Sequence, residues 1–285
     1  MMLGLILARL GLRNPSPVVS VIRLTGVIGA ARPFRSGLSL AGLAETIERA
    51  FNLPGLKAVA LAINSPGGSP AQSALIMGRI RALADERQIP VLAFVEDVGA
   101  SGGYWLALAG DEIWVNLNSI VGSIGVIYSG FGFVDALQKL GIERRLHTSG
   151  ERKSLLDPFL PEQPHDVERL NAVQTEIHAN FKEAVRARRG RRLKGSDEQL
   201  FSGEFWVGRR AVDIGLADGI GELRGVMRDR FGKRVRLRLV GRRESWLRRR
   251  FGLPVGRSED GLGHGLVEGA LGALEARAWW GRYGL

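Results

Sequence analysis

The sequence contains no cysteine and only four histidines, His147, His165, His178 and His264. Without cysteine the chain has no disulfide, no thiolate zinc site, no iron–sulfur cluster and no cysteine nucleophile. The histidines are scattered along 285 residues, so a catalyst that needs an imidazole base has few candidates. Serine chemistry with a base other than histidine is therefore a real alternative.

The sequence also lacks a run of about 20 apolar residues, the length that spans a bilayer. The chain begins with an apolar stretch that Arg9 interrupts, and it has neither a basic region nor a cleavage site typical of a secretory signal. We expect residues 1–16 to pack on the domain or to act as a peripheral anchor. The expected location is the cytoplasm, or the inner face of a membrane.

Positive charge is present in excess, with a net charge of +11, and it is concentrated in two stretches. Residues 182–194, which include the basic cluster Arg186–Lys194, carry +6, and residues 224–250 carry +10, so the remainder of the chain is mildly acidic at −5. Few aromatic residues lie among these basic residues, which disfavours nucleic acid as a partner. A contact with another subunit or with an anionic membrane surface is the expected role.

Short apolar runs alternate with segments of helical periodicity, which predicts an α/β domain over residues 17–241. Residues 242–285 are Arg-rich and then Gly-rich, and they are expected to form an extension outside that domain. The expected strands are Val18–Leu24, Ala58–Ile63, Val91–Val95, Glu112–Val115, Ile124–Ile127 and Glu143–His147. The expected helices are 40–51, 71–85, 104–109, 134–140, a long one over 167–185 with Pro164 near its start, and 222–231.

Two glycine-rich turns follow strands of the buried type, at the edge of the sheet where α/β proteins bind ligands. The first is Asn64–Gly68, and the second is Gly99–Gly103, in which Ser101 stands between glycines at the start of a helix. Backbone N–H groups of two such turns can form an oxyanion hole, worth about 3–4 kcal/mol per donor to a tetrahedral intermediate. The alternative is a set of plain turn glycines in a nucleotide-binding fold, although neither turn has the phosphate-loop pattern.

A serine nucleophile needs a base, and the sequence offers two kinds. The Gly99–Gly103 turn matches Gly-x-Ser-x-Gly, so an α/β-hydrolase with a later histidine is one reading. None of the four histidines occupies the C-terminal loop position that this fold requires. The other candidate is Lys153, in a polar turn beside Leu155, Leu156 and Phe159, although a lysine in such a loop is by itself most often a solvated charge.

Five motifs in order resemble the signal peptide peptidase A family of serine proteases, over about Val18 to Phe231. They are Asn64-Ser65-Pro66-Gly67-Gly68, Gly99-Ala100-Ser101-Gly102-Gly103-Tyr104-Trp105, Gly122-Ser123-Ile124-Gly125-Val126, Gly150-Glu151-Arg152-Lys153-Ser154, and Phe205-Trp206-Val207-Gly208 with the residues that follow it. The resemblance implies an α/β fold of the Clp-protease/crotonase type, a superhelix of β-β-α units with flanking helices. It also implies peptide hydrolysis without a cofactor or metal.

The resemblance assigns roles to individual residues. It implies that Ser101 is the nucleophile, Lys153 the general base and Ser123 the residue that orients the lysine amine, with Gly68 and Gly102 as oxyanion-hole donors. Both members of the dyad would come from one chain, and the site would be completed where subunits adjoin in a homo-oligomeric ring. Two alternatives stay open: a crotonase-type acyl-CoA enzyme, and a non-catalytic ring scaffold.

A lysine acts as a base only when it is neutral, which requires a pKa lowered from about 10.4 toward 7. Burial in an apolar groove shifts a lysine pKa in that direction, and Leu155, Leu156 and Phe159 could supply such a groove. Small residues such as Ala71 and Ala100 predict substrates with small or apolar side chains. The resemblance implies signal-peptide remnants among such substrates. An extended peptide could pair with the backbone after Gly68 and around Ser123–Val126.

Overall fold

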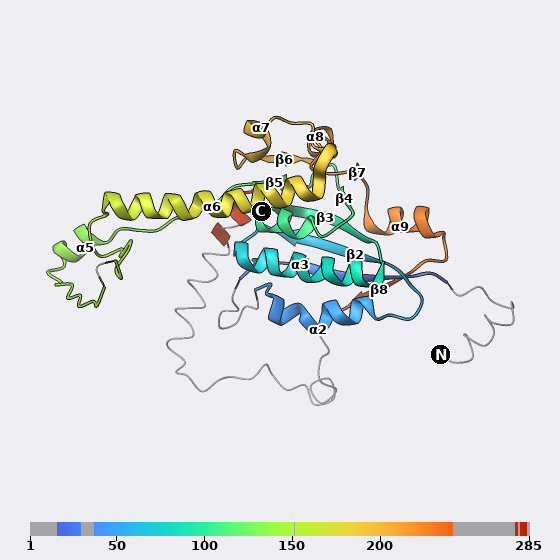
Figure 1. The fold of residues 1–285 in the computed structure, drawn as a ribbon, viewed down its shortest axis with the longest axis horizontal. Coiled ribbons are helices and arrows are strands. Elements are labelled where there is room, and N and C mark those ends of the chain that lie inside the picture. The colour runs from blue at the N-terminus through green and yellow to red at the C-terminus, as the bar shows by residue number, and fades with distance from the viewer. Residues whose placement is uncertain (1–15, 30–36, 151, 242–276, 279, 284–285) are drawn as a thin grey trace, which may run out of the picture.

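A single mixed sheet forms the centre of the molecule, which is known from a computed structural model that describes residues 16–29, 37–150, 152–241, 277–278 and 280–283. The strand order is β6-β5-β3-β2-β1-β8, and β4 and β7 continue the sheet from β3 on a branch (Figure 1). All strand pairs are parallel except β5 with β6. The strands are β1 (Val18–Thr25), β2 (Leu56–Ser65), β3 (Val91–Ala100), β4 (Glu112–Val115), β5 (Ile120–Gly122), β6 (Phe205–Val207), β7 (Gly219–Ile220) and β8 (Arg236–Val240).

Helices cover both faces of the sheet and make it a three-layer α/β structure. The larger core lies between one face and α2, α3, α4 and α6, and the smaller core lies between the other face and α9. The helices are α2 (Leu40–Phe51), α3 (Pro70–Arg87), α4 (Gly102–Ala107), α5 (Val134–Lys139), α6 (Pro164–Arg189), α7 (Asp197–Phe201), α8 (Gly208–Asp213) and α9 (Leu223–Phe231), with a short 3-10 turn at Gly190–Arg192. The α/β class implied by the resemblance is therefore confirmed.

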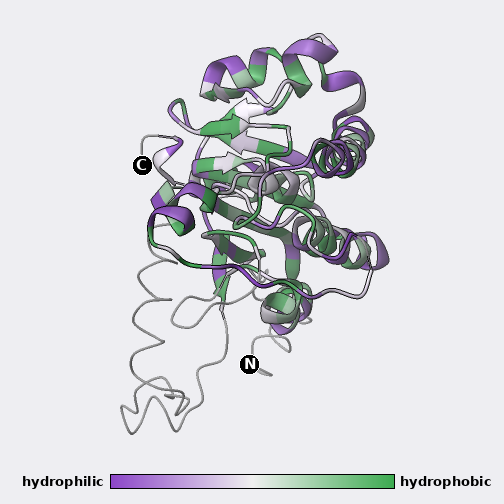
Figure 2. Cartoon of the chain, turned by 90° about the vertical axis from the view of Figure 1, so that its left-hand side faces the viewer, coloured by the Kyte–Doolittle hydropathy of each residue, from purple (hydrophilic) through white to green (hydrophobic). Residues whose placement is uncertain are grey.

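The sequence of β2 explains why this strand lies in the middle of the sheet. Val59, Leu61 and Ile63 point into the larger core, while the alternating alanines 58, 60 and 62 point into the smaller core. Successive strand residues face opposite sides, so a strand without polar residues at these positions must be covered on both faces. Figure 2 shows the strands coloured mainly as hydrophobic, with hydrophilic residues on the surrounding helices.

Two expected strands are wrong. Ile124–Ile127 forms no strand because Gly122 and Ser123, both with positive φ, turn the chain at the end of β5. Glu143–His147 is exposed and has no regular secondary structure, and no strand of the described residues pairs with it. Conversely, the short strands β5 and β6 and the Arg-rich strand β8 were not expected. The predicted segments 1–16 and 242–285 lie almost entirely outside the described residues.

A long projection extends from the body of the molecule (Figure 1). It consists of the N-terminal half of α6 and of residues 127–163, and we call residues 127–163 the arm. Helix α6 has 26 residues, which corresponds to a length of about 39 Å. Its C-terminal half packs on the body through Phe181 and Val185. The arm is attached at the opposite end of α6, where the N–H of Leu156 donates to an Asp166 carboxylate oxygen at 3.2 Å.

None of the helices in the described part of the chain has the length and apolar character needed to cross a lipid bilayer.

Candidate active site

Ser101 lies on a sharp turn between the end of β3 and the start of α4. Its backbone has φ 52° and ψ −123°, a conformation that costs a residue other than glycine about 1–3 kcal/mol. The Ser101 N–H donates to the carbonyl of Gly122 in β5 at 2.8 Å, which holds the turn in place. A strained turn from strand to helix is the arrangement that exposes the nucleophilic serine in α/β-hydrolases.

The Asn64–Gly68 turn packs directly against Ser101. A Cβ on Gly67 would lie 2.8 Å from the Ser101 Cβ and 2.9 Å from the Gly102 nitrogen, and one on Gly103 would lie 2.3 Å from the Ser65 carbonyl oxygen. Real Cβ atoms do not approach other atoms so closely, so both turns need glycine. The two glycine turns that the sequence singled out therefore form one site.

Two backbone N–H groups are available beside Ser101. The N–H of Ser69 donates to the Ile28 carbonyl, and the N–H of Ile28 donates to the Gly67 carbonyl, each at 2.8 Å. The N–H of Gly68, which lies between Gly67 and Ser69, is left unused. The Gly102 N–H belongs to the first turn of α4, where a helix has no internal acceptor. Among the described residues neither group donates a hydrogen bond, and a Cβ on Gly102 would lie 3.3 Å from the Gly68 nitrogen. Two free backbone N–H groups this close together are the kind of donor pair that forms an oxyanion hole.

Ser123 lies at the same edge of the sheet, directly after Gly122. Its N–H donates to the Glu204 carbonyl at 2.6 Å, and its φ is 52°. The structure thus brings together Ser101, Gly68, Gly102 and Ser123. Gly122, whose carbonyl anchors Ser101, was missed as a site residue, although its place inside the Gly122–Val126 motif could have indicated it.

Lys153 lies elsewhere, exposed in the arm. The arm is held near Asp166, which precedes Phe181 by fifteen residues of helix, or about 22 Å. Phe181 in turn stacks on Trp105, four residues after Ser101, with ring centroids 4.4 Å apart. Leu155 and Phe159, expected to bury the amine, are each 37% exposed. Within one copy of the chain, therefore, Lys153 is not brought to Ser101.

Among the described residues no histidine makes a hydrogen bond to Ser101. His178 lies on α6 with Nε2 3.0 Å from the Ile124 carbonyl, and His165 pairs with Asp166 at 2.9 Å. His147 lies in the exposed arm, and His264 lies outside the described residues. In the part of the chain that the structure describes, no group of three or more His, Asp or Glu residues is placed to hold a metal ion.

Comparison with known proteins gives a family and several relatives. Residues 84–231 match Peptidase family S49. The Na(+)/H(+) antiporter NhaA of Brucella abortus is 47% identical over 94% of this chain and 37% of its own length. The chloroplastic serine protease SPPA of Arabidopsis thaliana is 29% identical over 75% of this chain and 32% of its own length. Protease 4 of Haemophilus influenzae is 29% identical over 71% of this chain and 32% of its own length.

The chain spans about a third of the length of these relatives. The name of the Brucella protein describes ion transport, and the matched part is a minority of that protein. Among solved structures, the 1510-N membrane-bound stomatin-specific protease aligns with 80% of this chain and 99% of its own, with 14% identity and a TM-score of 0.45.

Proposed function

The chain belongs to Peptidase family S49, and from this premise we propose that it is a serine endopeptidase whose nucleophile is Ser101. The observation that carries the proposal is the strained Ser101 turn, with the unused N–H groups of Gly68 and Gly102 beside it. A scaffold without catalytic function would have no need for a strained serine between packed glycines. An acyl-CoA enzyme of the crotonase type would leave the serine at this position without a role.

In the proposed reaction, a neutral lysine amine removes the Ser101 hydroxyl proton while Oγ attacks the peptide carbonyl carbon. The carbonyl oxygen becomes an oxyanion and accepts hydrogen bonds from the N–H groups of Gly68 and Gly102, each worth about 3–4 kcal/mol. The C–N bond then breaks, and the lysine ammonium gives its proton to the leaving amine. Water, deprotonated by the same amine, attacks the acyl-enzyme, and the proton returns to Ser101.

The base in this scheme is Lys153, and we place it in the site of a neighbouring copy of the chain. The arm that carries Lys153 is held at Asp166, which lies about 22 Å along α6 from Phe181, a residue that stacks on Trp105 beside the Ser101 turn. The resemblance implied that both dyad residues come from one chain, whereas the projecting arm favours a contribution from a second one. Ser123 would orient the incoming amine through its hydroxyl.

The surface of the arm supports assembly into a ring. Its exposed apolar residues include Ile127, Tyr128, Phe131, Leu140 and Ile142, each at least 50% exposed. A monomeric protein rarely exposes so many large apolar side chains in one region. A head-to-tail contact in which each arm reaches the next Ser101 turn would cover them and would close into a ring.

The proposed substrates are extended peptides with small or apolar side chains, such as signal-peptide remnants. In the described structure the backbone of Val126 and Ile127 pairs with no strand, so it can accept a peptide by strand addition. The glycines at 67 and 68 let a peptide backbone approach closely. A location in the cytoplasm, with the basic residues of α9 and β8 against an anionic membrane surface, is part of the same proposal.

Subunit mixing tests the proposed site. Ser101→Ala and Lys153→Ala oligomers should each be inactive toward a fluorogenic peptide. After dissociation and joint reassembly, about a quarter of the sites in a random equimolar mixture would combine an intact serine with an intact neighbouring lysine. Recovery of about that share of activity is the expected result. Inactive mixtures would place both residues in one chain, and an active Lys153→Ala enzyme would exclude lysine as the base.

A further inference from the structure

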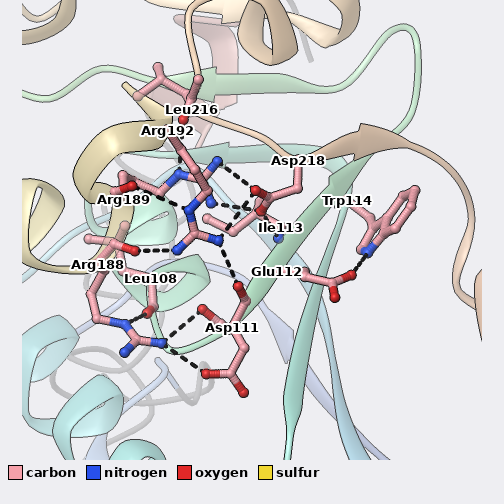
Figure 3. A network of polar contacts seen from close by, with 12 residues as sticks. Leu108, Asp111, Glu112, Ile113, Trp114, Arg188, Arg189, Arg192, Leu216 and Asp218 are labelled. Atoms are coloured by element: carbon pink, nitrogen blue, oxygen red, sulfur yellow. Dashed lines mark hydrogen bonds and ion pairs between the residues drawn. The ribbon is translucent and has the colours of Figure 1, made fainter. Parts of the chain in front are cut away.

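The basic cluster Arg186–Lys194 at the end of α6 is only partly a surface feature. Arg189 is 2% exposed, and the Arg188 guanidinium lies against backbone carbonyls, so the surface contact expected of this cluster does not extend to these two side chains. Arg186 and Arg191 do face solvent. The inward-facing arginines form a polar network with the segment after α4 and with the turn before β7 (Figure 3).

Arg188 holds the carboxyl end of α4. Its Nε donates to the Leu108 carbonyl at 2.8 Å, and its Nη2 donates to the Gly110 carbonyl at 3.1 Å. The same Nη2 lies 3.2 Å from Asp111 Oδ1. The last carbonyls of a helix have no partner inside the helix, and a cation at that end is favoured by the helix dipole. Arg188 therefore fixes α4 at the end opposite Ser101.

Arg189 acts on α4 through the turn before β7. Its guanidinium makes a two-pronged ion pair with Asp218 at 2.7 and 3.1 Å, and its Nε donates to the Gly215 carbonyl at 2.9 Å. Asp218 is also bound by the N–H of Ile113 at 2.7 Å. Between Gly215 and Asp218, the carbonyl of Leu216 accepts a hydrogen bond from the hydroxyl of Tyr104 at 2.8 Å.

Tyr104 carries this constraint to the nucleophile. It lies three residues after Ser101 on α4 and is completely buried. Burial raises the pKa of its hydroxyl, so Tyr104 stays a neutral hydrogen-bond donor at physiological pH. Because α4 has only six residues, a tilt or rotation at Tyr104 or Leu108 moves Ser101 and the Gly102 N–H with it.

We propose that Arg188 and Arg189 are positioning residues for the nucleophile: Arg188 through the carboxyl end of α4, and Arg189 through Asp218, Leu216 and Tyr104. The proposal rests on the proposed function, because it supposes that Ser101 reacts. Neither arginine touches substrate. Their effect is to hold the Ser101 Oγ and the Gly102 N–H in the relative geometry that the oxyanion requires, where a displacement of about 1 Å can cost about 100-fold in rate.

The experiment measures how fast a fluorophosphonate probe modifies Ser101 in the purified protein, without dissociating any assembly it forms. Labelling at a series of probe concentrations separates the apparent binding constant from the maximal rate of modification. The variants are Arg188→Lys, Arg189→Lys and Tyr104→Phe, and the matched control is Arg191→Lys on the solvent side of the same cluster. Ser101→Ala is the blank, and the melting temperature of each variant establishes that it is folded at the assay temperature.

The expected result is a maximal labelling rate about 10-fold lower in the three variants, with the binding constant unchanged. Arg191→Lys should behave as wild type. Tyr104→Phe removes a single oxygen. It therefore tests the connection from Arg189 through Tyr104 to Ser101 even if Arg189→Lys does not fold. Wild-type labelling rates in folded Arg188→Lys and Tyr104→Phe would overturn the positioning role alone. Absence of labelling in the wild type would overturn the nucleophile and the positioning role together.

Discussion

Gly67 and Ser101 are packed so closely that the Cβ that Gly67 lacks would lie 2.8 Å from the Ser101 Cβ. The φ of Gly67, +106°, is also one that other residues rarely adopt. The two glycine turns, separated by a helix and a strand in the sequence, therefore form one rigid unit at the end of the sheet.

Gly67→Ala should lower kcat by about 100-fold, because an added methyl must displace Ser101 or the Gly102 N–H. The measurement is steady-state peptide hydrolysis together with the melting temperature. Gly78→Ala is the control, since a Cβ there meets nothing within 4 Å in the middle of α3. That change should raise stability by about 0.5–1 kcal/mol and leave kcat unaltered. Equal kcat values for the two variants would contradict the close packing of the turns.

Acid should weaken the fold through Asp218. Burial raises the pKa of this carboxyl, but the hydrogen bonds from Arg189 and Ile113 and the nearby arginine charges lower it more, so its pKa is lowered overall. A carboxyl with a lowered folded-state pKa stabilises the fold above its unfolded pKa of about 3.9. That stabilisation is lost as the pH falls through the folded-state value.

Asp218→Asn should therefore cost about 3 kcal/mol at pH 7, because it leaves the buried Arg189 charge without its partner. The cost should shrink as the pH falls below about 4, where the wild-type carboxyl also becomes neutral. Urea unfolding of both proteins at several pH values measures the difference. Asp157→Asn is the control, because Asp157 pairs with Arg144 in the arm, away from the core. A cost for Asp218→Asn that is constant from pH 7 to pH 3 would contradict the assigned ion pair.

The parts of the fold that the sequence predicts are those in which a few consecutive residues already show which side chains are buried. The core strands β1 to β4 and the helices α2, α3 and α6 follow from apolar runs and helical spacing, and each end was located to within five residues, the largest error being the carboxyl end of β3. The strand expected at Ile124–Ile127 failed because the positive φ of Ser123 is not encoded by its residue type. β8 was not predicted because its leucines alternate with arginines, and a stretch rich in arginine indicates a charged surface segment.

The residues of the candidate site differ in the same way: some have a local signature in the sequence, and the positions of others depend on how the elements pack. Ser101, Gly68 and Gly102 were predicted because glycine turns after buried strands have a direct signature in the sequence. Their mutual contact is a matter of sheet order, which places β2, β3 and β5 side by side. The distance of Lys153 from Ser101 within one chain depends on the direction in which α6 leaves the body. Likewise, only the packing of α6 on α4 distinguishes Arg188 and Arg189 from the solvated arginines beside them.

The stacking of Trp105 on Phe181 joins α4 to α6, and its loss should be costly. The rings are nearly parallel, at 8°, with centroids 4.4 Å apart, and Phe181 is 2% exposed. Phe181→Ala should lower the free energy of unfolding by about 3–5 kcal/mol, as large-to-small changes in a core do. Val173→Ala, on the same helix but 37% exposed, should cost less than about 1 kcal/mol. Denaturant unfolding of the two variants measures the contrast, and similar costs would show that α6 does not pack through Phe181.

Assembly through the arm predicts that its exposed apolar residues are needed for the oligomer but not for the fold. Phe131→Asp and Leu140→Asp place a charge where the side chains are now 80% and 71% exposed. Within one chain such a charge stays in water and costs little, whereas buried at an interface it costs several kcal/mol. Sedimentation should therefore show smaller species with a near-native circular dichroism spectrum. Leu75→Asp, 50% exposed on α3, is the control and should leave the oligomer intact. If both arm variants sediment like the wild type, the arm lies outside the subunit contact and Lys153 cannot reach a neighbouring Ser101 by that route.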